Sequence, residues 1–574
     1  MREFKKYIVV CNKITKVKIK ENESLIELES RDDYKDKNII IELTKFVTNT
    51  YKLNERYKDL IEIASFVYTA DRKASRGTET VVEAHSWSRI FEIHIGVRDL
   101  KFWNSSEIKE KLNELLKFIT GDHHYEFCFY KTGNEIPFTL FDNEDYKVET
   151  KRPNKVLLFS GGLDSLAGTI ETLATTDRDV CLVSHQTGHP ATRTTQKRLF
   201  EEFKKEYGDR VNHYIFNCSL TKEQSKDESQ RTRSFLYTSI AFAVAVTNGI
   251  NNINVYENGI TSLNFPETQD QMNARASRTT HPKTLDLLQR IFTDVLGKKF
   301  YIKNEYMYKT KTDVVDVIKT HNKQNLIDTS VSCSVTRKKK KGYTHCGKCS
   351  QCIDRIFAIH AADLVEYDDN GIYDFRFYKE DLDEPIITKS LTDYLRLAQE
   401  FKFNSFMGFY AKFGNEIIDF EPYVMGKDEK TRIERIRQLG IRHADQIDNA
   451  VKNMIARYTS SFAPKRPNSF YVKILDERLY QKHRRDIQKE TNTETYTEDI
   501  EEIVKLRKFR KGELQSKLKE FIKELRLEKY ETVPSSKISL IARRLRKEGY
   551  DAKEASIGTV LRKMDYAYVR EDNR

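Results

Sequence analysis

The sequence predicts an α/β protein organised around a parallel sheet, and three observations support this prediction. Across residues 151–370, short apolar segments alternate with amphipathic ones, the pattern of strands joined by helices on both faces of a parallel sheet. The first apolar segment, KVLLFS at 155–160, leads directly into two consecutive glycines. Four of the eight cysteines lie together between Cys333 and Cys352. Residues 151–370 are therefore expected to form the central domain.

Length and composition exclude several classes of protein. The chain has 574 residues, of which 39% are hydrophobic, with only 10 Pro and 22 Gly, so it can bury cores and is not a disordered chain. At about 150 residues per domain, three or four domains are expected. The first residues, MREFKKYIVVCNK, have no sustained apolar core, and the longest apolar run, 235–246, is too short to span a bilayer. We predict a cytoplasmic protein that contacts no membrane.

The flanking regions differ from the centre in pattern. Residues 1–150 mix strand-like and helical segments, which predicts an α+β domain that recognises a partner or substrate, or only buttresses the centre. Residues 371–500 are charged and have helical apolar spacing, which predicts a helical domain. Residues 501–574 carry 20 Lys and Arg against 13 Asp and Glu, so +7 of the chain's net charge of +12 lies there. A nucleic acid or another acidic partner is expected to meet this last region.

The last region also has a pattern of its own. Residues 535–572 have the outline of a helix-turn-helix or winged-helix unit, with a small protein-docking module as the alternative. Apolar residues between Ile503 and Leu525 predict a long amphipathic helix or a helix pair, whose apolar face packs within the chain or joins two copies of it. Whether this region binds DNA, RNA or protein, and whether the chain forms a homo-oligomer, stays open.

The sharpest local signal is the glycine turn that follows the first strand of the central domain. The run from Ser160 to Ser165, SGGLDS, leads from an apolar strand into a helix. Glycines let the backbone approach a ligand without a Cβ in the way, and the free N–H groups of a new helix point at an anion. The run fits neither the Walker motif nor Gly-x-Gly-x-x-Gly. It predicts a phosphate-binding turn, with a purely structural strand-to-helix turn as the alternative.

The clustered cysteines predict a metal site. Two overlapping Cys-x-x-Cys steps and a fourth cysteine upstream supply four thiolates that can surround one tetrahedral ion. Zinc in a structural role is the simplest interpretation; an iron–sulfur cluster and unliganded thiols are the alternatives. The expected ligands are Cys333, Cys346, Cys349 and Cys352.

These motifs together resemble the PP-loop ATP pyrophosphatase superfamily, whose SGGxDS loop binds ATP and releases pyrophosphate as a substrate is adenylated. The resemblance implies that the loop binds the phosphates of ATP and that Asp164 positions the loop or Mg²⁺. It further implies that the second strand of the domain, VCLVSH, ends beside the adenine. The implied ATP-binding residues are Ser160, Gly161, Gly162, Leu163, Asp164, Ser165, Ser184, His185 and Gln186.

Within that superfamily, the chain is similar to QueC, the 7-cyano-7-deazaguanine synthase family, over roughly residues 153–368. The similarity rests on SGGLDS, Lys311, the Ser-x-Ser-Cys-Ser run around Cys333, CGKCSQC and the following Asp354-Arg355. It implies a carbon–nitrogen ligase that adenylates 7-carboxy-7-deazaguanine, forms the amide with ammonia and dehydrates the amide to a nitrile with a second ATP. The implied cofactors are ATP, Mg²⁺ and Zn²⁺. The implied catalytic residues are Asp164, Ser165 and Lys311; without the resemblance, Lys311 would be taken for an ordinary exposed lysine.

Two segments depart from the QueC pattern at the expected base-binding pocket. Residues 257–266 (ENGITSLNFP) and 278–282 (RTTHP) stand where QueC carries a Tyr-Pro-Asp-Cys-Arg stretch. A basic run at 337–341 is either a solvated loop or a contact to nucleic acid or an acidic partner. The expected substrate contacts are Asn264, Arg278 and His281.

The departing segments and the added terminal regions are similar to the QueC-like proteins of bacterial anti-phage systems, such as the QatC group and the QueC-like accessory proteins of CBASS. This similarity implies a deazaguanine-type substrate, a protein partner from the same defence system, and either ammonia or a protein amine as the acyl acceptor. Two other functions stay open: an RNA-modifying PP-loop enzyme that acts on tRNA, and a nucleotide-controlled binding protein without turnover.

Overall fold

The computed structural model divides the chain into two compact units, Met1–Arg485 and Asp486–Arg574. The residues that it describes are 4–31, 34–35, 37–43, 54–76, 88–133, 153–185, 190–221, 231–266, 278–334, 342–368, 371–460, 466–475, 518–519, 532–533, 541 and 567–568. Among these residues, every helix is too short or too polar to cross a membrane.

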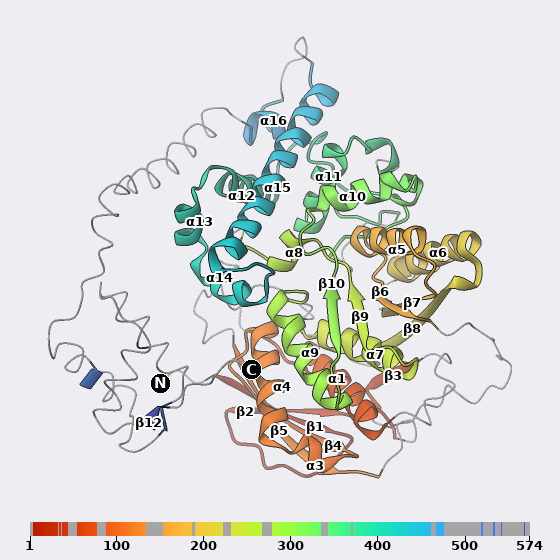
Figure 1. Cartoon of the computed structure of the whole chain (residues 1–574), viewed down its shortest axis with the longest axis vertical. Coiled ribbons are helices and arrows are strands. Elements are labelled where there is room, and N and C mark those ends of the chain that lie inside the picture. Colours follow the sequence, from red (N-terminus) through yellow and green to blue (C-terminus); the bar gives the residue numbers. More distant parts are fainter. Residues whose placement is uncertain are drawn as a thin grey trace. The chain divides into compact units, whose positions relative to one another are not determined.

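A six-stranded sheet forms the centre of the first unit (Figure 1). Its strands are β3 (Ile39–Leu43), β6 (Lys155–Leu158), β7 (Val180–His185), β8 (Val211–Leu220), β9 (Asn252–Val255) and β10 (Tyr301–Asn304). Their order is β10-β9-β6-β7-β8-β3, and every pairing is parallel except that of β3 with β8. The five parallel strands come from the central region, which confirms the predicted parallel α/β centre.

Helices cover both faces of this sheet. They are α5 (Leu163–Thr175), α6 (Pro190–Tyr207), α7 (Arg233–Thr247), α8 (Gly259–Leu263), α9 (Pro282–Leu296), α10 (Lys311–Thr320) and α11 (Ser350–Ala361), with short 3₁₀ turns η2 (Gly208–Arg210), η5 (Gln324–Leu326) and η6 (Val365–Tyr367). Residues of α7 and α9 share one apolar core, and residues of α5, α6, α10 and α11 share another. Because both faces are covered, β7 is buried at every position.

The N-terminal region adds a second sheet of four strands. Its elements are β1 (Lys5–Cys11), β2 (Glu23–Leu28), β4 (Arg89–Val97), β5 (His124–Lys131), α1 (Glu55–Lys73), α3 (Leu100–Trp103) and α4 (Ser106–Thr120). The order is β2-β1-β4-β5 and all pairings are parallel, so the expected α+β arrangement is corrected to an α/β one. Apolar spacing predicts that a segment is a strand, but strand direction depends on the crossover connections, which local pattern does not reveal.

The N-terminal region and the centre are not packed as separate bodies. Strand β3, from the N-terminal region, extends the central sheet beyond β8. Helix α1 packs on α7, and α4 packs on α9. Their buried side chains belong to one continuous apolar core. The boundary placed near residue 150 therefore divides neither the central sheet, which includes β3, nor the apolar core.

A helical extension follows the central domain. Its elements are α12 (Pro385–Phe403), α13 (Phe406–Lys412), α14 (Gly414–Phe420), η7 (Glu421–Tyr423), α15 (Glu429–Tyr458) and α16 (Phe470–Lys473). Helix α15 has apolar residues three or four positions apart, and these form its buried face. The helix packs against α11 and α12. The core of the extension includes Cys333 and Cys352, so the cysteine cluster is part of this packing.

In the second unit, the described residues include two short strands, β11 (Thr532–Val533) and β12 (Ala567–Tyr568), which pair in parallel. The predicted amphipathic helix at 503–525 and the predicted helix-turn-helix unit lie almost wholly outside the described residues.

Candidate active site and metal centre

The SGGLDS turn joins β6 to α5 at the carboxyl end of the central sheet. Gly161 has a φ of +84°, and a Cβ there would lie 3.0 Å from Thr195 Cγ2, so the turn requires glycine at this position. The hydroxyls of Ser160 and Ser165 lie 3.1 Å apart and accept hydrogen bonds of 3.2 Å from the N–H groups of Gly162 and Gly161. Two hydroxyls and two amides thus converge at a helix N-terminus, a donor set that fits a phosphate or pyrophosphate anion.

A buried ion pair lies beside this turn. Lys311, the first residue of α10, forms a salt bridge with Asp164, the second residue of α5. Their exposed fractions are 2% and 7%. The second oxygen of Asp164 accepts hydrogen bonds of 3.0 Å from both the backbone N and the Nδ2 of Asn258. Lys311 is therefore not the exposed lysine that its sequence context alone suggests.

Glu257 brings another carboxyl group to the same place. Its side chain is half-buried, and its Oε1 receives a long hydrogen bond of 3.5 Å from Asn258 Nδ2. Burial and then the charge of Asp164 raise the pKa of Glu257 to about 8, against the opposing effect of Lys311. Burial alone would lower the pKa of Lys311, but Asp164, Glu257 and Asp354 outweigh burial and raise it. The site therefore combines a fixed cation with a carboxyl group that exchanges its proton near neutral pH.

The segment just before the first clustered cysteine packs against the phosphate-binding turn. The N–H of Val331 donates a hydrogen bond of 2.9 Å to the carbonyl of Gly161. Arg355 of α11, fully buried and paired with Asp368, donates to the carbonyl and the hydroxyl of Ser330 at 3.1 and 2.8 Å. The metal centre and the turn are thus joined through a few residues, so the geometry of one supports the other.

The four clustered cysteines form a compact cluster. Their Sγ atoms all lie within 4.8 Å of one another. Cys333 and Cys349 are 3.9 Å apart, as are Cys346 and Cys352. Four sulfurs bound to one zinc ion at about 2.3 Å would lie about 3.8 Å apart, so the set fits a tetrahedral zinc ion. With four thiolate ligands the ion would have no open position, and its role would be structural.

The helical extension contacts the N-terminus of α10, where Lys311 lies. Gln446 of α15 accepts a hydrogen bond of 2.5 Å from Thr310 Oγ1 and donates one of 2.7 Å to Asp313. Arg442 donates to the other oxygen of Asp313 at 3.1 Å and to the carbonyl of Tyr308 at 2.6 Å. Thr310 and Asp313 also form the capping box of α10. The N-terminus of α10, and with it Lys311, is therefore held from both sides.

The residues expected beside adenine lie at the end of β7. The Ser184 hydroxyl donates to the carbonyl of Phe159 at 2.6 Å, so this side chain joins two strands. His185 is buried between Tyr237 and the backbone of Cys218, and burial lowers its pKa to about 3. Gln186 lies outside the described residues. The proposed contacts with adenine stay predictions.

The three expected substrate contacts have structural partners. Arg278 donates to the carbonyl of Phe118 at 3.2 Å, and its guanidinium lies over the Phe118 ring. His281 caps α9 through Nδ1 and is buried against the same ring. Asn264 ends α8 in a left-handed conformation. These contacts attach α8 and α9 to their neighbours, and the predicted role in substrate binding stays a prediction.

Sequence reasoning did not select Asn258 or Gln196 for the site. Asn258 holds Asp164, as described above. Gln196 of α6 donates to the carbonyls of Ser160 and His185 at 3.2 and 3.5 Å and so connects the ends of β6 and β7. The sequence position of Asn258 could have indicated its role, because polar residues shortly after a buried parallel strand lie at the ligand-binding edge of the sheet. No such signal was present for Gln196, which lies inside an ordinary amphipathic helix.

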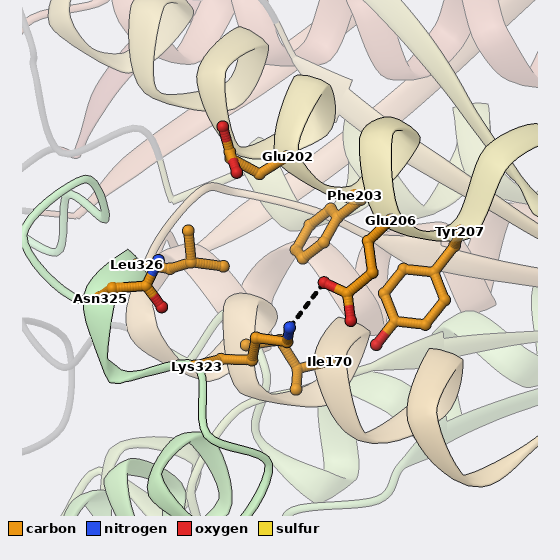
Figure 2. Close-up of a pocket in the computed structure, with 8 residues that line it drawn as sticks. All are labelled: Ile170, Glu202, Phe203, Glu206, Tyr207, Lys323, Asn325 and Leu326. Atoms are coloured by element: carbon orange, nitrogen blue, oxygen red, sulfur yellow. Dashed lines mark ion pairs between the residues drawn. The ribbon is translucent and has the colours of Figure 1, made fainter.

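A small pocket and a second set of metal-compatible groups lie outside this site. A pocket of about 50 Å³ lies between α5, α6 and η5. Figure 2 shows the ion pair of Lys323 with Glu206 among its lining residues; the two charged groups are 2.6 Å apart. A second set of metal-compatible groups, Glu92, His94 and Cys128, lies on the N-terminal sheet. There, His94 already bonds Glu92 and Tyr130 at 2.8 and 2.9 Å, so a cross-strand hydrogen-bond chain accounts for it.

The parallel sheet, the SGGLDS turn at the end of β6 and the cysteine cluster are together consistent with an α/β domain of the PP-loop class. Residues 154–363 match the family model of QueC, the queuosine biosynthesis protein QueC. Proteins of that family are ATP pyrophosphatases of the ligase type, which bind ATP and typically zinc. A comparison with curated proteins gives no match.

Proposed function

We propose that this protein uses ATP to adenylate a carboxylate, with 7-carboxy-7-deazaguanine as the acid, and then joins the activated carbon to an amine nitrogen. The observation that carries the proposal is the arrangement of the SGGLDS turn beside the buried Asp164–Lys311 pair, within a region that matches QueC. The nitrogen comes from ammonia or from a protein amine. The setting in bacterial anti-phage defence, with a partner protein, rests on the resemblance of the flanking segments.

The chemistry follows from what the turn can bind. A carboxylate oxygen of the acid attacks the α-phosphorus of ATP, and pyrophosphate leaves. The hydroxyls of Ser160 and Ser165 and the amides of Gly161 and Gly162 would bind the leaving pyrophosphate, and Lys311 would offset its charge. Bound Mg²⁺ would supply further positive charge; to hold the ion, Asp164 would exchange one of its bonds to Lys311 or Asn258 for it. In this structure the two amides donate to the two serine hydroxyls, so bonds within the turn would be exchanged for bonds to the pyrophosphate.

The test is ATP–pyrophosphate exchange by the full-length protein with and without 7-carboxy-7-deazaguanine. We expect exchange that depends on the acid and that falls by at least about 100-fold in Ser160→Ala, the range for removing one group that stabilises developing charge. The matched control is Ser390→Ala, a half-buried serine in α12 whose hydroxyl donates to the carbonyl of Ile386. If ATP binds but no carboxylate supports exchange, the proposal is wrong.

A further inference from the structure

The carboxyl group of Glu257 lies in the proposed reaction site, and among the residues that the structure describes it has no strong hydrogen-bond partner. Its hydrogen bond from Asn258 Nδ2 is long, at 3.5 Å, whereas the shorter bond of 3.0 Å from the same nitrogen goes to Asp164. Its backbone, by contrast, is firmly held: the N–H donates to Asn304 Oδ1 at 3.2 Å, and the carbonyl accepts from Asn304 Nδ2 at 2.9 Å. A fixed backbone with an unengaged carboxyl group is typical of a residue that meets a ligand.

We infer that Glu257 is the general base that removes the proton from the attacking amine nitrogen in the second half of the reaction. This inference rests on the proposed function. In the step, the nitrogen lone pair forms the C–N bond to the acyl carbon, the C–O bond to AMP breaks, and its electron pair leaves with AMP. The proton that the nitrogen must lose passes to the Glu257 carboxylate and then to solvent.

The surroundings of Glu257 suit this role. The charged groups that act on it are Asp164 from α5, Lys311 from α10, Asp354 from α11 and Arg233 from α7. Asp164 is committed to Lys311 and Asn258, and Asp354 accepts a hydrogen bond of 2.8 Å from Tyr394. Of these three carboxyl groups, Glu257 is therefore the least engaged. A base is most effective when its pKa lies near the working pH, and the raised pKa of Glu257, about 8, meets that condition.

The experiment compares Glu257→Gln with the wild type in three assays. Exchange of pyrophosphate into ATP reports adenylation, which needs no base at the amine, so we expect a change of less than about twofold. Product formation from ammonium salts needs the base, so we expect a loss of about 100-fold or more and a changed pH profile. Hydroxylamine is unprotonated and strongly nucleophilic at neutral pH, so its acyl product should form at near the wild-type rate. Glu257→Asp should recover part of the ammonia-dependent rate.

The matched control is Glu305→Gln, which removes a carboxylate one strand away that is bonded to Asn254 at 2.8 Å. It should leave all three assays unchanged. If Glu257→Gln loses pyrophosphate exchange, Glu257 serves adenylation and the inference is wrong; if it keeps the full rate with ammonia, the inference is also wrong. Absence of exchange in the wild type would instead overturn the proposed function, and with it this inference.

Discussion

Arg89 in the N-terminal region and Lys311 beside the SGGLDS turn are both buried cations, and they differ in how completely their neighbours satisfy them. All five N–H groups of Arg89 have acceptors: the carboxylates of Asp71 and Asp122 and the carbonyls of Asp71 and Ala74, at 2.5 to 3.2 Å. Lys311 pairs with Asp164, and the nearby carboxyl of Glu257 is left almost free. A saturated cluster stabilises the fold, whereas one that leaves a charged group free can bind a ligand.

The cysteine cluster is the most extreme case of a site whose charges its own neighbours do not satisfy. Four thiolates packed together need a metal ion to offset their charge. We expect about one zinc ion per chain, and we expect Cys349→Ser or a strong chelator to release it and to destabilise the first unit by several kcal/mol or more, since small zinc sites contribute on the order of 10 kcal/mol. Metal analysis and thermal unfolding check this. Cys128→Ser is the control. A metal-free protein of equal stability would contradict the assignment.

Arg89→Met should be the most destabilising change outside the metal centre. It leaves Asp71 and Asp122 buried without their main cation, and breaking a buried pair in this way costs about 3–5 kcal/mol. Denaturant unfolding measures the loss. Pyrophosphate exchange per folded molecule should stay near the wild-type value, because the Arg89 cluster has no role in the proposed chemistry. A stable Arg89→Met variant with impaired exchange would show that the Arg89 cluster serves the reaction and not the stability of the fold.

Lys311→Met should impair pyrophosphate exchange far more than it destabilises the fold. Asp164 would be left buried without its cation but keeps its two hydrogen bonds from Asn258, so we expect a smaller loss of unfolding free energy than in Arg89→Met, which leaves two carboxylates without their main cation. Exchange should fall by about 100- to 1,000-fold, the usual effect of losing one group that stabilises developing charge. Lys303→Met, an exposed lysine in β10, is the control. Wild-type exchange in Lys311→Met would show that the buried pair is only structural.

Features of the fold and the site that depend on a short run of residues could be predicted from the sequence, whereas those that depend on contacts between distant residues could not. The SGGLDS turn and the Cys-x-x-Cys steps are short runs whose spacing carries the geometry, so both were predicted with their residues. Lys311 was selected only by resemblance, because its pairing with Asp164 spans 147 positions of the chain. The free carboxyl of Glu257, the contacts of Gln446 and the pairing of β3 with β8 depend on tertiary packing, which no local pattern encodes.

The helical extension lies outside the residues that match QueC, and its contact with α10 can be tested separately. Gln446→Leu removes the hydrogen bonds to Thr310 and Asp313 but leaves Lys311 itself in place. We expect kcat to fall about fivefold, equivalent to about 1 kcal/mol for one net hydrogen bond, with KM for ATP unchanged. The control is Lys452→Met, an exposed residue of the same helix. An unchanged kcat would show that α15 does not help to position Lys311.

The Arg89 cluster and the Glu257 carboxyl group beside Lys311 should change the unfolding free energy in opposite directions as the pH rises. Burial alone would raise the pKa values of Asp71 and Asp122, but the charges of Arg89 and Arg76 outweigh burial and lower both. A lowered pKa gives stability that is present above the unfolded value, about 3.9, and is lost as the pH falls through the folded value. The pKa of Glu257 is raised to about 8 instead, so the folded protein binds an extra proton between about 4.3 and 8, and its contribution to stability is lost as the pH rises.

The unfolding free energy of the wild type should therefore decline between pH 5 and pH 9. This decline should be clearly smaller in Glu257→Gln, because about 1.4 kcal/mol is lost per pH unit over the range in which only the folded state binds the proton. Denaturant unfolding at pH 5, 7 and 9 measures it. Glu305→Gln should decline as the wild type does, which separates the effect of Glu257 from the loss of any single carboxylate. An identical decline in Glu257→Gln would mean that Glu257 is ionised throughout this range, and its carboxyl would then be too weak a base at neutral pH to remove the proton of the amine.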